Sequence, residues 1–281
     1  MGNILLIAKK ELNDLLSNRM VLVVLIGFFA TVIFSVYDLY DILNRGLMPQ
    51  MQYGDSVGMV FACYLLNTLS MNYGPAVGIM IGCASISSER HQNALSTLLV
   101  KPLYRDTIIN GKLMGSLAFI ALVIGITTAI YTSVLFILCG NAFAPTLGDY
   151  FSRLPLVLLL SMIIVSIFLS VSVLISLMVR NQAFAMILSV IVLYISSFAQ
   201  TEGFSGVLCN MLPEYGDFIH KWIINSAPTG FLVAMKNNLF NSSITAIDSL
   251  VLVIPDIAKF SLFAIIACIL SYIVFVRSDR A

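Results

Sequence analysis

Six long apolar runs constrain the fold of this chain more than any other feature. They cover residues 20–37, 57–87, 113–139, 154–179, 183–199 and 260–276. A helix needs about 20 mainly apolar residues to cross a hydrocarbon core of roughly 30 Å. The runs are continuous and lack the two-residue alternation of membrane β-strands, which span about ten residues each. The sequence therefore predicts an all-α membrane protein with six transmembrane helices, in one domain over residues 20–281.

The low content of charged residues supports this prediction. Only 10% of the residues are charged and mean hydropathy is +0.99, whereas a soluble domain carries about a quarter charged residues. None of the six runs contains Asp, Glu, Lys, Arg or His. Ion-coupled carriers and intramembrane enzymes keep such groups for function, so both classes are disfavoured. Any uphill transport must then draw its energy from another protein.

The distribution of Lys and Arg predicts the orientation. With the N-terminus inside, the inner segments hold ten of the 15 Lys and Arg residues and the outer segments hold five. This bias favours a multi-pass plasma-membrane protein with both termini in the cytoplasm. A net charge of +1 without a basic tail gives no indication of nucleic-acid binding. The five cysteines show no CxxC or Cys/His ligand spacing, so we expect small buried hydrophobes and no metal or cofactor in this chain.

A helical pattern precedes the first run. Residues 1–19 are predicted to form an amphipathic helix that lies in the membrane interface, with its apolar side in the acyl chains. That apolar side consists of Ile4, Leu5, Ala8, Leu12, Leu15 and Leu16, and the opposite side of Lys9, Lys10, Asn13, Asp14 and Ser17.

Glycine recurs at every fourth position in the second run, at Gly74, Gly78 and Gly82, and Pro75 follows the first of them. The glycines allow another backbone to approach closely, and Pro75 should kink the helix. Tight packing within one subunit and an interface between subunits or along a pathway remain equally open. Hydroxyl groups in the third and fourth runs are expected to bond to their own helix or a neighbour rather than to a substrate: Thr127, Thr128, Thr132, Ser133, Ser166, Ser170, Ser172 and Ser176.

The outer segment between the fifth and sixth runs holds two apolar pieces too short to cross the membrane, residues 218–224 and 231–240. Pro228 and Gly230 lie in the break between them, which predicts a re-entrant segment over residues 213–240. Glu214, Asp217 and His220 lie close together there. A solvated face of an interfacial helix is favoured for them over a metal or proton site.

The most charged long stretch lies between the second and third runs. Residues 88–101 can form a short helix whose apolar side holds Leu95, Leu98 and Leu99. Ser87 or Ser88 is expected to cap its start, and Pro102 to end it. A new helix then runs from Tyr104 through Lys112 into the third run. A small amphipathic helix between two membrane helices fits a groove on a soluble partner; the alternative is a solvated loop that carries positive-inside charge.

Three stretches resemble ABC-2 type permeases, the transmembrane subunits of type V ATP-binding cassette (ABC) transporters. Residues 88–115, SERHQNALSTLLVKPLYRDTIINGKLMG, resemble the coupling-helix signature: an acidic residue, a helix ending in Leu-Leu, then a Pro, an Arg and Gly-Lys. Residues 7–20 are similar to the family's elbow helix, and residues 225–240 to its re-entrant segment. Asn93-Ala94 departs from the Gly-Thr or Gly-Ser of many relatives, which affects the docking geometry. In length and in lacking a large outer domain, the chain looks closest to the permeases of nitrous oxide reductase maturation.

The resemblance implies a permease homodimer with two cytosolic ATPase subunits that bind ATP and magnesium, while this chain has no catalytic residue of its own. It implies export or flipping of an apolar or amphipathic cargo. The residues expected to contact the ATPase are Glu89, Arg90, Leu95, Leu98 and Leu99. Arg105 and Lys112 are expected to hold the segment that connects this helix to the third run. The alternative is a scaffold that does not transport and transmits force to an extracytoplasmic partner.

Overall fold

The computed structural model describes residues 2–45, 56–91, 105–179, 181–198, 202–212, 215–216, 218–219, 238–241 and 244–277. Across these residues the regular elements are helical and none is a strand. The α-helices are α1 (Gly2–Ser17), α2 (Arg19–Asn44), α3 (Val57–Asn67), α4 (Gly74–His91), α6 (Arg105–Phe143), α7 (Leu147–Met178), α8 (Gln182–Phe198), α9 (Glu202–Met211) and α12 (Ala246–Arg277). A π-helix, η1 (Thr68–Asn72), joins α3 to α4, and a 3-10 turn, η2 (Ala144–Thr146), joins α6 to α7.

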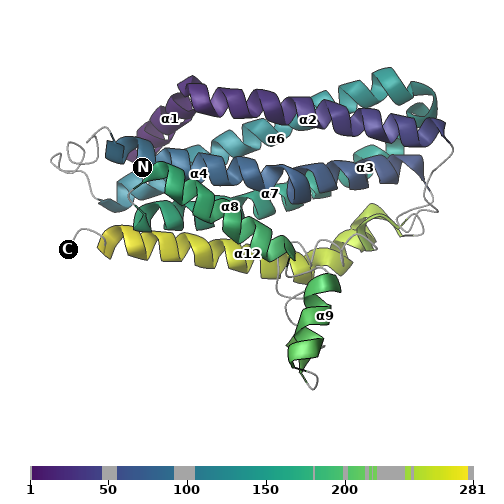
Figure 1. The fold of residues 1–281 in the computed structure, drawn as a ribbon. Helices are drawn as coiled ribbons and strands as arrows, with labels where there is room; N and C mark the ends of the chain where they lie inside the picture. The colour runs from purple at the N-terminus through teal and green to yellow at the C-terminus, as the bar shows by residue number, and fades with distance from the viewer. Residues whose placement is uncertain are drawn as a thin grey trace.

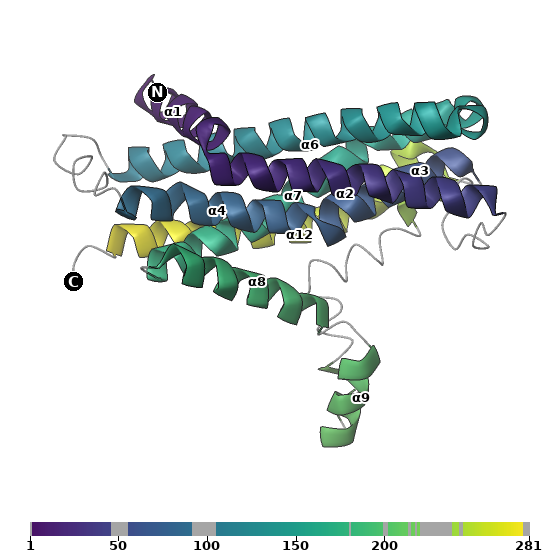
Figure 2. The ribbon, with the colours of Figure 1, turned by 45° about the horizontal axis from the view of Figure 1, so that its top comes forward.

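The long helices form a bundle of roughly parallel rods (Figure 1). α1, the end of α4, the start of α6 and the end of α12 lie at one end, which we call the terminal end because both chain termini lie there. The opposite end, where α2 ends and α3 begins, is called the far end. α7 is the central helix and packs against α3, α4, α6, α8 and α12. α9 leads away from the bundle in both views (Figure 2).

Three stretches of the described chain are long and apolar enough to cross a membrane: Arg19–Asn44, Thr107–Met178 and Ala246–Val274. The second is 72 residues long and contains both α6 and α7. α8 is a shorter apolar helix of 17 residues. The prediction of an all-helical chain with several membrane-length apolar helices is therefore confirmed for the residues that the structure describes.

Several helices extend beyond the apolar runs that predicted them, among them α2 and α12. α2 begins where the Asn18 side chain accepts a hydrogen bond from the Met20 amide at 3.0 Å, and it continues to Asn44. α12 begins at Ala246, 14 residues before its apolar run, because Thr245 accepts a hydrogen bond from the Asp248 amide and caps the helix. The last turns of α2 contain polar residues, so hydropathy alone does not locate its end. The 14 residues before the apolar run of α12 are mostly apolar, so the predicted run starts too late.

The helix of the second run is interrupted just before Pro75. α3 ends at Asn67, the chain forms one π-turn over Thr68–Asn72, and α4 starts at Gly74. The Tyr73 amide donates to the Thr68 carbonyl, five residues back, at 3.3 Å. Proline has no amide hydrogen to continue the helical ladder, so the interruption lies where the sequence predicted it.

The three glycines spaced four residues apart in α4 pack against α7 within the same chain. We call Gly74, Gly78 and Gly82 the glycine ridge. A Cβ at Gly78 would stand 2.8 Å from the Val165 carbonyl oxygen, and one at Gly82 would stand 2.7 Å from the Leu169 carbonyl oxygen. Only hydrogen in place of a side chain allows the two backbones to approach this closely. Of the two alternatives left open by the sequence, these contacts favour packing within one subunit.

Hydroxyl side chains bond along and between these helices. The hydroxyls of Thr127, Thr128, Thr132, Ser133, Ser166, Ser170 and Ser172 each donate to a carbonyl three or four residues earlier in their own helix. Between helices, Ser70 in η1 bonds to Ser161 in α7 at 3.0 Å, and Ser271 in α12 donates to the Ser170 carbonyl at 3.0 Å. The expectation that these hydroxyls serve packing is confirmed for these residues.

Candidate functional site

The predicted coupling residues fall partly within the described chain. Glu89 and Arg90 lie in the last turn of α4, and Arg105 is the first residue of α6. Leu95, Leu98 and Leu99 lie outside the described residues, as do Pro228 and Gly230 of the predicted re-entrant break and Glu214, Asp217 and His220. The contacts of the coupling helix and the re-entrant segment therefore stay predictions.

One local prediction in this region is wrong. Ser87 and Ser88 do not cap a new helix, because α4 continues through both of them to His91. The helix that we expected to restart near Tyr104 does so at Arg105 and continues without a loop into the third apolar run. The segment 92–104 is thus flanked by two helical arms, the end of α4 and the start of α6. The arms contact each other at the terminal end of the bundle (Figure 2).

A buried ion pair joins both arms to α1. The Lys112 ammonium in α6 donates to Glu11 Oε2 in α1 at 2.9 Å and to the Ser85 carbonyl in α4 at 2.8 Å. The two charged side chains are 9% and 7% exposed. We call this group of Glu11, Ser85 and Lys112 the terminal junction. It holds α1 and the two arms together at the end of the bundle that carries the segment 92–104.

Two glycines seat α1 directly on α6. A Cβ at Gly111 would stand 2.7 Å from Ile7 Cβ, and one at Gly115 would stand 2.7 Å from the Ala8 carbonyl oxygen and 2.8 Å from Glu11 Cβ. These glycines flank Lys112, so the close approach of the backbones brings Glu11 within reach of the ammonium. At both glycines the backbone of α6 lies against α1 with no room for a side chain, so α1 packs as part of the bundle.

α1 packs against α6 with Ala8, Glu11 and Leu15, which are buried, while Leu5 and Leu16 on its predicted apolar side are 58% and 39% exposed. The placement of that apolar side in the acyl chains stays a prediction. Glu11 belonged to neither of the two predicted faces. A usable signal was the spacing of Gly111 and Gly115 on either side of a lysine, since small residues four apart favour a docked helix.

A third buried charge, Arg153 of α7, lies toward the far end and was missed. Its guanidinium donates to the carbonyls of Asn241 at 3.2 Å, Ile244 at 2.6 Å and Thr245 at 3.3 Å, and the residue is 1% exposed. These carbonyls directly precede α12. The signal in the sequence was an arginine in a segment predicted to lie outside, immediately before an apolar run, whereas most Lys and Arg residues were predicted to lie inside. Arg153 fixes the entry to α12 against α7.

Replacement of Arg153 with leucine is expected to lower the free energy of unfolding by about 3 kcal/mol, because three carbonyls lose a charged donor. Arg153→Lys should recover only part of this, since an ammonium lacks the planar fork that reaches several acceptors. Denaturation with SDS in mixed micelles measures both. Arg45→Leu is the control: Arg45 pairs with Asp41 on the exposed end of α2, and its loss should cost about 1 kcal/mol or less. Equal stability of Arg153→Lys and the wild type would show that the planar guanidinium and its three hydrogen bonds to carbonyls are not required.

The described residues contain no group of three or more His, Cys, Asp or Glu side chains placed to hold a metal ion. What the site brings together is a set of mechanical connections: a buried ion pair between three helices, two glycine contacts and the arms that flank the segment 92–104. Together with the membrane-length helices, these features define a polytopic helical membrane protein.

The comparison with protein families identifies the family. The sequence model of the family described as ABC-2 family transporter protein matches residues 5–280, nearly the whole chain. The chain therefore belongs to the ABC-2 transporter family, and the resemblance noted in the sequence is confirmed at that level. No curated protein matches the chain.

Proposed function

We propose that this chain is the permease subunit of an ABC transporter, driven by ATP that a separate subunit hydrolyses. The observation that carries the proposal is the family match over residues 5–280. The sequence of the chain contains no phosphate-binding loop of the form GxxxxGK[ST]. Around Gly111-Lys112, the position of the first glycine is held by Asp106 and the position of the Ser or Thr by Leu113. ATP and magnesium would be bound by the partner.

The terminal end is the proposed face for the ATPase. In this proposal a coupling helix over residues 88–101 docks on the ATPase through Glu89, Arg90, Leu95, Leu98 and Leu99, and Arg105 holds the connector to α6. The terminal junction supports the second half of this arrangement, since Lys112 bonds to the α4 arm and to α1 at once. A push on the segment 92–104 would then reach α1, α4 and α6 together.

The assembly that we propose is a pair of permease chains in the plasma membrane with their termini in the cytoplasm and two ATPase subunits beneath them. The cargo would be apolar or amphipathic and exported or flipped, and the permeases of nitrous oxide reductase maturation are the proposed nearest subgroup. If the chain transmits force to an outer partner instead, ATP hydrolysis will respond to that partner and not to added lipid or peptide.

The test is to co-express the chain with the ATPase encoded beside it, purify the complex and measure ATP hydrolysis in lipid. Glu89→Ala should weaken hydrolysis and Leu95→Asp should abolish assembly, because a carboxylate would be placed in the apolar face of the docking helix. Arg45→Ala is the matched control, since Arg45 is charged and exposed where α2 ends at the far end of the bundle, away from the proposed contact.

Assembly that survives Leu95→Asp at the wild-type level contradicts the proposed docking helix. An ATPase that neither binds the wild-type chain nor changes its hydrolysis in its presence contradicts the proposed function itself. The two results are distinct, because the first concerns one segment and the second the whole complex.

A further inference from the structure

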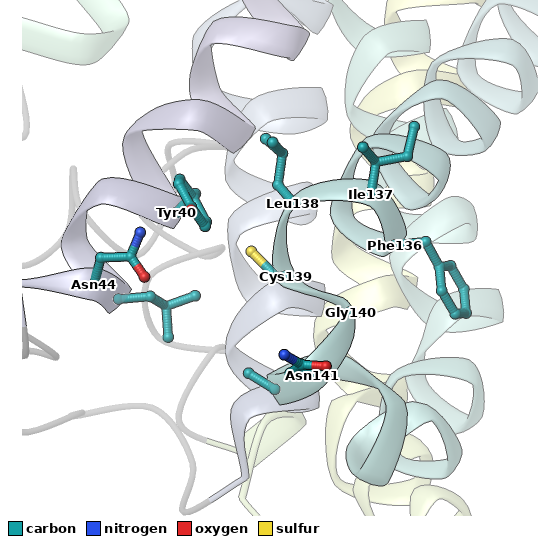
Figure 3. A pocket seen from close by; sticks show the side chains of 10 residues that line it. Tyr40, Asn44, Phe136, Ile137, Leu138, Cys139, Gly140 and Asn141 are labelled. Atoms are coloured by element: carbon teal, nitrogen blue, oxygen red, sulfur yellow. The ribbon is translucent and has the colours of Figure 1, made fainter.

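A cavity of about 440 Å³ opens at the far end of the bundle, between the last turns of α2 and the last turns of α6. Tyr40, Leu43 and Asn44 line it from α2, and residues 136–142 line it from α6. In Figure 3, Tyr40 and Asn44 face Cys139 and Asn141 across the space, while the Phe136 side chain points away from it. The volume lies in the range of small-molecule sites.

Two features of the α6 backbone make this space. Cys139 has φ −113° and ψ 17°, which breaks the helical geometry inside α6. Gly140 follows, and a Cβ built on it would meet no atom within 4 Å. The broken turn and the residue without a side chain both lie in the wall of the cavity, and there is room beside Gly140 for a larger side chain.

The described side chains that line the cavity offer hydrogen bonds and no net charge. Tyr40 contributes a phenol, and Asn44 and Asn141 contribute amides. The nearest charged groups on α2, Asp41 and Arg45, pair with each other at 2.7 Å. Such a lining suits an uncharged group with several hydroxyls better than a phosphate or an ammonium, because nothing in it compensates a full charge.

The surroundings of the cavity favour a ligand with acyl chains. α2 and α6 both end here after membrane-length apolar stretches. In the same halves of these helices, Phe34 and Tyr37 on α2 and Ile137 on α6 are 68%, 57% and 80% exposed. Aromatic side chains at span ends are typical of the membrane–water boundary. A lipid with its headgroup in the cavity could lay its chains along these side chains.

We propose that the cavity between Tyr40, Asn44, Cys139 and Asn141 binds the uncharged, hydroxyl-bearing headgroup of a membrane lipid. This inference rests on the membrane location of the chain and is independent of any ATPase. It can therefore fail while the proposed permease function holds, and the reverse.

The experiment measures which lipids the purified full-length chain retains, by native mass spectrometry after exchange into nanodiscs. The nanodiscs contain monoglucosyl diacylglycerol and phosphatidylglycerol in equal amounts. The wild type should retain the glucosyl lipid preferentially. Asn44→Ala and Asn141→Ala should each weaken retention about fivefold, the effect of one lost hydrogen bond to a neutral partner.

Gly140→Leu is the decisive variant, because its side chain should fill the cavity and abolish retention. Gly125→Leu is its matched control: Gly125 lies on the same helix, and a Cβ there also meets no atom within 4 Å. A thermal melt of each variant shows that the fold is kept, and the two exposed asparagine variants test the site even if Gly140→Leu unfolds.

Three outcomes would overturn the proposal. They are equal retention of the charged lipid, equal retention by Gly140→Leu and Gly125→Leu, and competition by soluble methyl glucoside as strong as that by the glucosyl lipid. The last would assign the cavity to a soluble polyol in place of a lipid. Preferential glucosyl-lipid retention that Gly140→Leu removes and Gly125→Leu preserves would establish the site.

Discussion

Replacement of Gly74 with alanine is expected to lower the free energy of unfolding by more than about 4 kcal/mol, at the high end for one substitution. A Cβ at Gly74 would overlap the Leu69 carbonyl oxygen and stand 2.8 Å from the Leu69 carbonyl carbon and 3.0 Å from Val165 Cγ2. Leu69 lies in η1, so the overlap is with backbone and no side-chain rotation can relieve it. The π-turn and the contact of α4 with α7 would both have to shift.

The loss in the free energy of unfolding should depend on which glycine is replaced. A Cβ at Gly82 would stand 2.7 Å from the Leu169 carbonyl oxygen, and its other close contacts are with the Ser172 side chain. Because that side chain can rotate, Gly82→Ala should lower the free energy of unfolding by less than Gly74→Ala. Gly27→Ala in α2 meets nothing within 4 Å and should be neutral or stabilising by up to about 1 kcal/mol, because alanine favours helix. SDS titration in mixed micelles measures all three. A Gly74→Ala protein as stable as Gly27→Ala would mean that η1 and α4 do not meet as described.

Much of the helical content could be predicted because it depends on one local property, the hydropathy of each segment. Each apolar run coincides with observed helix, since a lipid-facing or core-facing segment of that length has no other way to satisfy its backbone. The break before Pro75 was predictable for the same reason: the missing amide hydrogen is a local fact of the sequence. The π-turn itself was not, because it depends on how Leu69, Gly74 and Val165 meet in space.

The contacts that join the helices could not be predicted in the same way. The role of Glu11 depends on which residue of α6 faces it, 101 positions later, and periodicity within α1 carries no such information. Arg153 likewise acts on carbonyls about 90 residues away. The glycine ridge showed that a close contact exists, but its partner in α7 was visible only in the structure.

The placement of buried charge explains how an uncharged set of runs holds together. Among the described residues the buried charged side chains are Glu11, Lys112 and Arg153. Lys112 and Arg153 directly precede the third and fourth apolar runs. The middle of the bundle uses glycine contacts and serine hydroxyls, where an ion would cost most. Charged connections therefore lie next to the ends of the runs, and one of them joins the two arms that flank the segment 92–104.

Removal of the Lys112 charge tests this arrangement most directly. In Lys112→Met, the Glu11 carboxylate stays buried without its cation and the Ser85 carbonyl loses its donor, so we expect a loss of about 3 kcal/mol or more in the free energy of unfolding. The double variant Glu11→Gln with Lys112→Met should recover most of this loss, because no charge is then left unpaired and buried pairs are often replaceable by neutral groups. The same SDS titration measures the free energy of unfolding of the wild type, the single variants and the double variant.

Two controls separate the ion pair from general damage to the interface. Ser116→Ala changes a buried hydroxyl one turn further along α6 that has no hydrogen-bond partner among the described residues, so it should be close to neutral. Lys10→Met removes an exposed charge from α1 and should also be close to neutral. If Lys112→Met is no less stable than these, the junction contributes nothing. If instead Lys112→Met loses stability and the double variant recovers it, a specific pair of charges holds α1 to the two arms that flank the segment 92–104, and a movement of one arm must involve all three helices.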